Sequence, residues 1–202
     1  MKPVRVYFET GERWVFAGAV DWPGWCRGDK SEDEAINALL GYTSRYSKAV
    51  GVDLPTGSVE VIGRVPTRSG MADFGAPGAF GPWDDEPLPA RELGRHLGLI
   101  HASWAYLDGV ATVSPPQLRK GPRGGGRDRE AVLKHVQEAE RAYAPKVGCR
   151  VPPRTPWDEQ RAMILSGLRA SPPDSAWPVR YAIRRLAWHI LDHAWEMEDR
   201  SS

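Results

Sequence analysis

The amino-acid sequence predicts two domains: an α+β domain of β-β-β-α-β order over residues 1–65, and an all-α antiparallel four-helix bundle over residues 88–202. β-Branched and aromatic residues are dense in the first 65 residues, whereas apolar residues recur at helical spacing from Ala90 onward. The segment between them, residues 66–87, is rich in proline and glycine. Because its aromatic side chains would be costly to leave in water, we expect an ordered but irregular linker.

Three strands are predicted at the N-terminus, in VRVYFET, ERWVFAGAV and WPGWC. One amphipathic helix is predicted over residues 31–50, where Ser31 is the N-cap and Glu34 completes a capping box. A fourth strand, VEVIGRV, is predicted at residues 59–65. The apolar face of the helix is expected to consist of Ile36, Leu39, Leu40 and Tyr46.

Four helices are predicted in the C-terminal half, with connections rich in proline and glycine, as is typical of a four-helix bundle. Asp128 is expected to cap the second helix, and Thr155 the third, with Pro156 at its first position. Pro178 is expected to open the fourth. The helices cover ARELGRHLGLIHASWAYLDG, DREAVLKHVQEAERAYA, a stretch from Trp157 through MILSGL, and VRYAIRRLAWHILDHAWEMED.

Composition narrows the classes of function. With 26% charged residues and a formal net charge of +1, the chain shows no electrostatic preference for nucleic acid or an acidic membrane. No apolar run approaches the roughly 20 residues of a membrane span, and the N-terminus lacks the apolar core of a signal peptide. The only cysteines, Cys26 and Cys149, are far apart, which suits a reducing compartment. A cytoplasmic protein with no membrane partner is expected.

The last predicted helix carries two histidines inside its apolar face. At about 100° per residue, His189 and His193 lie about 40° apart, in the sector that also holds Leu186 and Ile190. In the second predicted helix, His135 likewise falls in the apolar stripe. A buried neutral imidazole needs a partner for each ring nitrogen, because an unsatisfied polar group costs a kcal/mol or more.

The other faces of the last helix have their own pattern. Aromatic residues recur every seven positions on a neighbouring face and are expected to pack against another helix or domain. They are Tyr181, Trp188 and Trp195. The charged residues Arg184, Glu198 and Asp199 are expected mostly on the remaining surface.

Two histidines one turn apart, met by a third from a facing helix, favour a divalent metal site. Ring nitrogens at positions i and i+4 can converge on a point about 2.1 Å from each. Three protein ligands leave coordination positions for water or substrate, as in a catalytic rather than a structural site. The candidate metal ligands are therefore His135, His189 and His193.

A second interpretation needs no metal. Each histidine could be a core residue bonded to a backbone carbonyl or to a carboxylate such as that of Glu140. The protein would then be a non-catalytic interaction module, whose aromatic N-terminal half, including Trp22 and Trp25, binds a partner or forms a homodimer.

Residues 88–200 resemble the DinB-like (YfiT-like) four-helix bundle superfamily, in the segments GGGRDREAVLKHVQEAER and WHILDHAWEMEDR. The resemblance implies that one histidine of the second helix and the HxxxH pair of the fourth, here His135, His189 and His193, bind a divalent metal, usually nickel or zinc. It also implies a metal-dependent thiol transferase or isomerase that acts on a small molecule with a low-molecular-weight thiol as cofactor. Many members have no known activity.

Residues 3–65 resemble the HicB-like fold of antitoxins, in the run VFAGAVDWPGWCRGDKSEDEAINALL. Antitoxins of this type normally add a DNA-binding module. No helix-turn-helix or ribbon-helix-helix pattern follows Val65, so a structural or partner-binding role is favoured over a transcriptional one.

The segment LRKGPRGGGRDR, residues 118–129, is a candidate anion or cofactor site. Backbone N–H groups at a helix N-terminus, reinforced by Arg123, Arg127 and Arg129, could hold a carboxylate or a phosphate. A solvated, flexible lead-in to the second helix is the alternative, and it is the favoured one. The segment lacks the interleaved aromatic residues of a single-strand nucleic-acid surface, so no nucleic-acid partner is expected. His101, on the first helix, borders the apolar face; a surface position is favoured over a role as an extra ligand.

Overall fold

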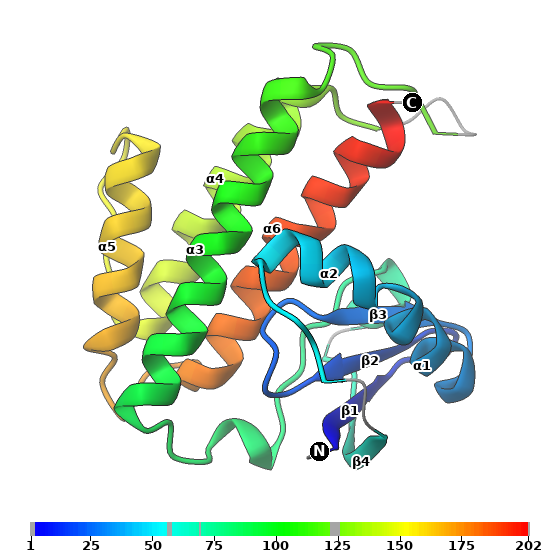
Figure 1. The fold of residues 1–202 in the computed structure, drawn as a ribbon. Coiled ribbons are helices and arrows are strands. Elements are labelled where there is room, and N and C mark those ends of the chain that lie inside the picture. Colours follow the sequence, from blue (N-terminus) through cyan, green and yellow to red (C-terminus); the bar gives the residue numbers. More distant parts are fainter. Residues whose placement is uncertain (1–2, 56–57, 69, 122–125, 202) are drawn as a thin grey trace.

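The N-terminal part of the chain forms a four-stranded mixed sheet, seen in the computed structural model of residues 3–55, 58–68, 70–121 and 126–201 (Figure 1). The strands are β1 (Val4–Thr10), β2 (Val15–Ala19), β3 (Cys26–Asp29) and β4 (Val59–Pro66), in the order β3-β2-β1-β4. β2 is antiparallel to β1 and to β3, whereas β4 is parallel to β1. The mixed α/β character predicted for this part is confirmed.

The third strand begins later than predicted. WPGWC is not a strand over its length, because Pro23 and Gly24 lie in a turn and β3 starts only at Cys26. Gly24 has φ of +93°, and a Cβ atom there would lie 2.8 Å from Cδ1 of Leu191. The turn therefore needs glycine both for its backbone conformation and for its close approach to the last helix.

The single helix predicted over residues 31–50 is wrong: two helices, α1 (Glu32–Gly41) and α2 (Thr43–Val50), meet at Tyr42. Gly41 is a weak helix former, and the Thr43 hydroxyl donates to the Leu40 carbonyl at 2.6 Å, so the ladder is interrupted there. The N-cap is confirmed, because the Ser31 hydroxyl accepts from the Glu34 N–H at 3.3 Å. The side chain of Leu40, predicted on the apolar face, is instead 42% exposed.

Residues 66–87 are irregular, with two short 3₁₀ turns, η1 (Met71–Phe74) and η2 (Pro82–Asp84). Trp83 is buried, and its ring lies 5.1 Å from that of Tyr7 on the sheet. The fully buried Glu9 carboxylate of β1 accepts from the backbone N–H groups of Gly78 and Ala79. Phe74 is the exception among the aromatic residues of the segment, at 88% exposure.

Four longer helices follow, and they lie side by side in Figure 1. Thr155 does not cap the third of them: its hydroxyl donates to the Pro152 carbonyl, and Pro156 occupies the cap position. Asp128 makes no capping bond with its side chain, which accepts instead from Lys120 and from the Leu118 N–H. The helices are α3 (Ala90–Val113), α4 (Arg129–Tyr143, continued by the 3₁₀ turn η3, Ala144–Val147), α5 (Trp157–Arg169) and α6 (Val179–Ser201). Among the described residues, no helix has the length and apolar character needed to cross a membrane.

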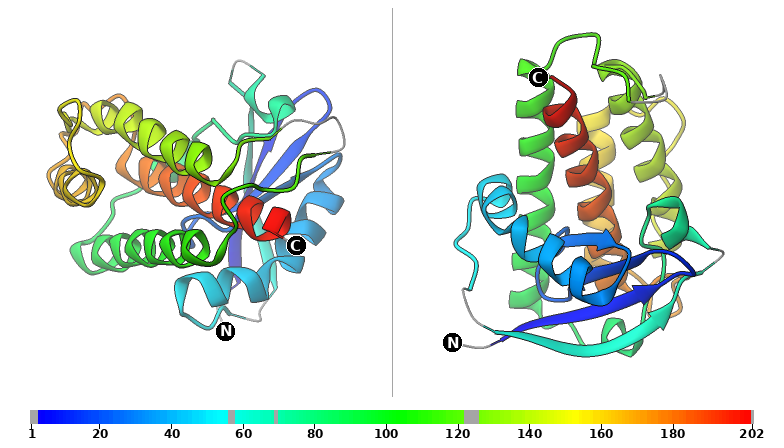
Figure 2. Two further views of the ribbon diagram at one scale, coloured as in Figure 1. Left: turned by 90° about the horizontal axis from the view of Figure 1, so that it is seen from above. Right: turned by 90° about the vertical axis from the view of Figure 1, so that its right-hand side faces the viewer.

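α6 packs against both the sheet and the other long helices, and it lies between α3 and α4 (Figure 2). Every residue from Arg180 to Leu191 is buried, which covers more than three full turns. Leu186 and Ile190 belong to the core shared by the long helices, whereas Leu191 and Trp195 belong to the core beneath the sheet. The aromatic face predicted for this helix is confirmed, since all three of its members are buried against neighbouring elements.

Arg184 was expected on the charged surface of this helix, and that expectation is wrong. Its side chain is buried and donates to both carboxylate oxygens of Asp84 in η2, at 2.7 and 2.8 Å. The guanidinium also lies over the Tyr7 ring, 4.4 Å from its centroid. Its partner, Asp84, lies in the irregular segment. Hydrophobic periodicity does not predict where that segment lies.

Replacing Asp84 by alanine is expected to lower the free energy of unfolding by about 3–5 kcal/mol, because the buried guanidinium of Arg184 would lose its partner. Urea denaturation measures the change. The control is Glu32→Ala, which removes a carboxylate bonded to exposed Arg64 and should cost a small fraction of that amount. Equal losses in the two variants would contradict the importance assigned to the buried pair.

His96 on α3 supplies a pH-dependent contribution to stability. Its side chain is fully buried, and Nη2 of Arg95 lies 3.0 Å from its Nε2. Burial, aided by the charge of Arg95, lowers the pKa of His96 to about 4. The imidazole of the unfolded chain titrates near 6.5, so the unfolded state binds more protons between these two values.

Stability from His96 is therefore fully present above about pH 6.5, and it falls by roughly 1.4 kcal/mol per pH unit as pH drops toward 4. Denaturation of the wild type and of His96→Gln at several pH values should show a shallower dependence in the variant. His101→Gln, at an exposed position of the same helix, is the control for removing an imidazole. Identical pH dependences in wild type and His96→Gln would refute this contribution.

Candidate metal centre

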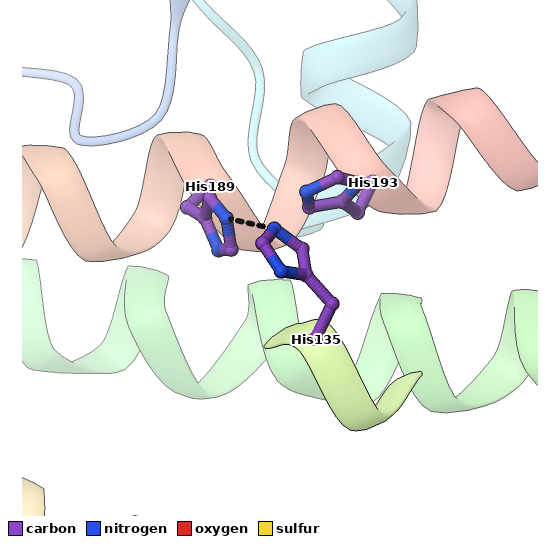
Figure 3. Close-up of side chains that lie close together, drawn as sticks. All are labelled: His135, His189 and His193. Atoms are coloured by element: carbon purple, nitrogen blue, oxygen red, sulfur yellow. Dashed lines mark hydrogen bonds between the residues drawn. The ribbon is translucent and has the colours of Figure 1, made fainter. Parts of the chain in front are cut away.

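Three histidines from two helices meet in the space between α4 and α6 (Figure 3). His189 and His193 project from consecutive turns of α6, and His135 rises toward them from α4. The ring centroids are 4.6–5.1 Å apart, and one nitrogen of each ring lies within 4.8 Å of the others. The convergence predicted from the two apolar stripes is confirmed.

The closest approach is between Nε2 of His189 and Nε2 of His135, at 3.2 Å. Two nitrogens bound about 2.1 Å from one ion are about 3.0–3.4 Å apart for octahedral to tetrahedral ligand angles. The same distance also suits an N–H···N hydrogen bond between two neutral imidazoles. The separation therefore fits a pair of metal ligands and equally a metal-free contact.

The third ring is held from its other side. Nδ1 of His193 lies 2.8 Å from Oε2 of Glu196, one turn further along α6. The second oxygen of that carboxylate accepts from Nη1 of Arg200 at 2.6 Å. Nε2 of His193 is thus the nitrogen left available to the other two rings.

Burial makes two of the imidazoles poor bases. His189 is 5% exposed, and desolvation, with the nearby charges of His193 and Arg185, lowers its pKa to about 2. Desolvation, with His193 and Arg127, also lowers the pKa of His135. Both rings are therefore neutral at neutral pH, which is the form that binds a metal ion.

The ligand set suits a borderline cation. Three imidazoles without a carboxylate favour zinc, nickel or copper over magnesium or calcium, which prefer oxygen ligands. One atom remains unsatisfied: Nδ1 of His189 is buried and has no hydrogen-bond partner among the described residues. A metal-bound histidine usually donates its other N–H to a hydrogen-bond acceptor. His193 has such an acceptor in Glu196, whereas His189 has none among the described residues.

Most of the candidate anion site remains a prediction. Arg123 lies outside the described residues. Arg129 is already engaged, because its Nη1 donates to the Ser114 carbonyl at 2.8 Å and its Nε to Glu130 at 3.0 Å. Arg127 is exposed and close enough to the centre to affect the pKa values of His135 and His189.

Other polar residues that the sequence singled out lie elsewhere. Glu140, considered as a histidine partner, instead accepts from the indole N–H groups of Trp104 and Trp157 at 2.6 and 2.7 Å. Burial raises the pKa of its carboxyl group. His101 is exposed, as favoured by the sequence, and lines a hollow between α3 and α5.

Sequence reasoning missed the contact between His193 and Glu196. The signal was present, because residues three apart on a helix are neighbours, and the carboxylate follows the second histidine at that spacing. Cys26 is buried, and desolvation raises the pKa of its thiol to about 12, so it is not a reactive nucleophile.

A scan of protein-family models, a search of curated proteins and a search of solved structures found no match to this chain. The chemistry of this cluster therefore has to be inferred from its own residues.

Proposed function

We propose that the protein binds a divalent cation, Zn²⁺ or Ni²⁺, through His135, His189 and His193. We further propose that it uses this centre in a reaction on a small molecule. The observation that supports this most is the meeting of three ring nitrogens, from two different helices, within 4.8 Å. Burial keeps two of the rings neutral and available as ligands.

In this proposal the histidines supply the ligand atoms and limit access of water. His135 and His189 offer Nε2 lone pairs 3.2 Å apart, and the buried position of His189 limits access of water from that side. Three ligands leave coordination positions for a substrate or water. When bound, the ion would act as a Lewis acid that makes a water molecule or a thiol more acidic.

We also propose that residues 88–200 belong with the DinB-like superfamily and that residues 3–65 have a HicB-like fold. The first is supported because the histidines lie on the second and fourth of the long helices, as the resemblance implies. The second is supported by the four-stranded sheet with helices between its third and fourth strands. Membership implies a thiol transferase or isomerase that uses a low-molecular-weight thiol, acting in the cytoplasm.

A non-catalytic interaction module is the second candidate, and two contacts are compatible with it. The 3.2 Å separation of His135 and His189 can be a hydrogen bond, and Glu196 partners His193 without any ion. In this case the cluster is a polar contact between two helices, and the N-terminal half binds a partner or a second copy of the chain.

Metal analysis of protein purified without a histidine tag and incubated with Zn²⁺ or Ni²⁺ should give close to one ion per chain. Replacing His135 or His189 by alanine should lower the affinity at least tenfold, because each supplies one of three ligands. His101→Ala, which removes an exposed histidine, should bind as the wild type does. A stoichiometry near zero in the wild type would rule out the metal centre.

Thermal unfolding with and without EDTA distinguishes the two candidates. An ion bound only by the folded state, at about 100 times its dissociation constant, adds about 2.7 kcal/mol of stability. EDTA should therefore lower the melting temperature of the metal-loaded wild type and leave that of His189→Ala unchanged. No effect of EDTA on the wild type, together with a stable oligomer in gel filtration, would favour the interaction module.

A further inference from the structure

We propose that Glu196 is a positioning residue for the histidine centre. Its carboxylate holds the proton of His193 on Nδ1, so that the lone pair of Nε2 faces His135 and His189. This inference rests on the proposed metal-binding function, and it adds a residue that neither the sequence pattern nor the three-histidine cluster identifies.

The contact between the two side chains is short and local. Oε2 of Glu196 lies 2.8 Å from Nδ1 of His193, and Glu196 follows His193 by three positions, about one turn of α6. The side chain of His193 is 13% exposed and that of Glu196 is 32% exposed, so the contact is partly shielded from water. A hydrogen bond to a carboxylate in such a place is stronger than one between neutral groups.

The carboxylate is itself held in place. Its Oε1 accepts from Nη1 of Arg200 at 2.6 Å, so each oxygen has a partner of its own. Nε of Arg200 donates to the carbonyl of Arg119 at 2.7 Å, and the Arg119 N–H donates back to the Arg200 carbonyl at 2.9 Å. Arg119 belongs to the segment that leads to α4, the helix of His135. The contacts that hold His193 thus extend through Glu196 and Arg200 to Arg119, beyond α6 itself.

The chemical consequence concerns which nitrogen carries the proton. An ionised carboxylate only accepts hydrogen bonds, so Nδ1 of a neutral His193 must be the donor and Nε2 the bare nitrogen. The bond also fixes the rotation of the ring. Metal-bound histidines are commonly oriented in this way by a carboxylate. Nδ1 of His189 has no such partner among the described residues, whereas Nδ1 of His193 has the Glu196 carboxylate.

A direct role as a ligand is the main competing assignment for Glu196. The group of atoms close enough to share an ion contains the three histidines and not this carboxylate, within the part of the chain that the structure describes. Its near oxygen instead contacts the Nδ1 side of the His193 ring. The geometry therefore favours positioning over coordination.

Two substitutions separate these roles. In Glu196→Ala the affinity for Zn²⁺, measured by competition with a chromophoric chelator, should fall about 10–100-fold. In Glu196→Gln the amide oxygen can still accept from Nδ1, so most of the affinity should return. The matched control is Glu138→Ala, which removes an exposed carboxylate near His135 that forms a 3.9 Å ion pair with Lys134 rather than a bond to a histidine. Wild-type affinity in Glu196→Ala, or an equal loss in Glu196→Gln, would overturn the positioning role.

A second measurement needs no metal. Nitrogen-15 NMR of the histidine rings at about pH 8, where an ordinary imidazole is neutral, reports which nitrogen carries the proton. His193 should be the Nδ1–H tautomer in the wild type, and should lose that preference in Glu196→Ala and not in Glu138→Ala. Failure of wild-type protein to bind Zn²⁺ would refute the proposed function, whereas an unchanged tautomer in Glu196→Ala would refute the role of Glu196 alone.

Discussion

The burial of the first half of α6, from Arg180 to Leu191, is the constraint on which the rest of the structure depends. This stretch packs against α3, α4 and the sheet, so a charged side chain within it needs a partner from another element. Arg184 finds Asp84 in η2, and Asp192 accepts from Arg27 of β3 at 3.0 Å. These pairs fix the rotation of the helix about its axis, and that rotation directs His189 and His193 toward α4.

The sequence predicts the candidate site better than it predicts the domain that precedes it. Periodicity of about 3.6 residues places His189 and His193 on one face, and His135 in a facing stripe, because long amphipathic helices obey that rule. The break at Tyr42 follows from a local bond between Thr43 and the Leu40 carbonyl, which helical periodicity does not report, whereas the turn before β3 also depends on a close approach to the distant Leu191. Arg184 was misplaced because its partner, Asp84, is a hundred residues away in the sequence.

Two interpretations of the three-histidine cluster share every contact in it. A hydrogen bond between His135 and His189 and a shared ion both bring two nitrogens to about 3 Å, and both require neutral rings. They differ in how the two Nε2 atoms are used, because the hydrogen bond needs a proton on one of them and an ion needs the lone pairs of both. In either case Nδ1 of His189 stays buried without a partner among the described residues. Under both interpretations this unpaired nitrogen lowers the stability of the cluster.

The residue that precedes each α6 histidine in the sequence contacts the sheet. Trp188 packs edge-on against Phe16 of β2, and Asp192 pairs with Arg27 of β3. A shift of β2 or β3 would thus act on the part of the α6 backbone that carries His189 or His193. The N-terminal half could therefore not be replaced by an unrelated domain without loss of these contacts. A replacement would have to provide an aromatic contact for the Trp188 indole and a guanidinium at the position of Arg27.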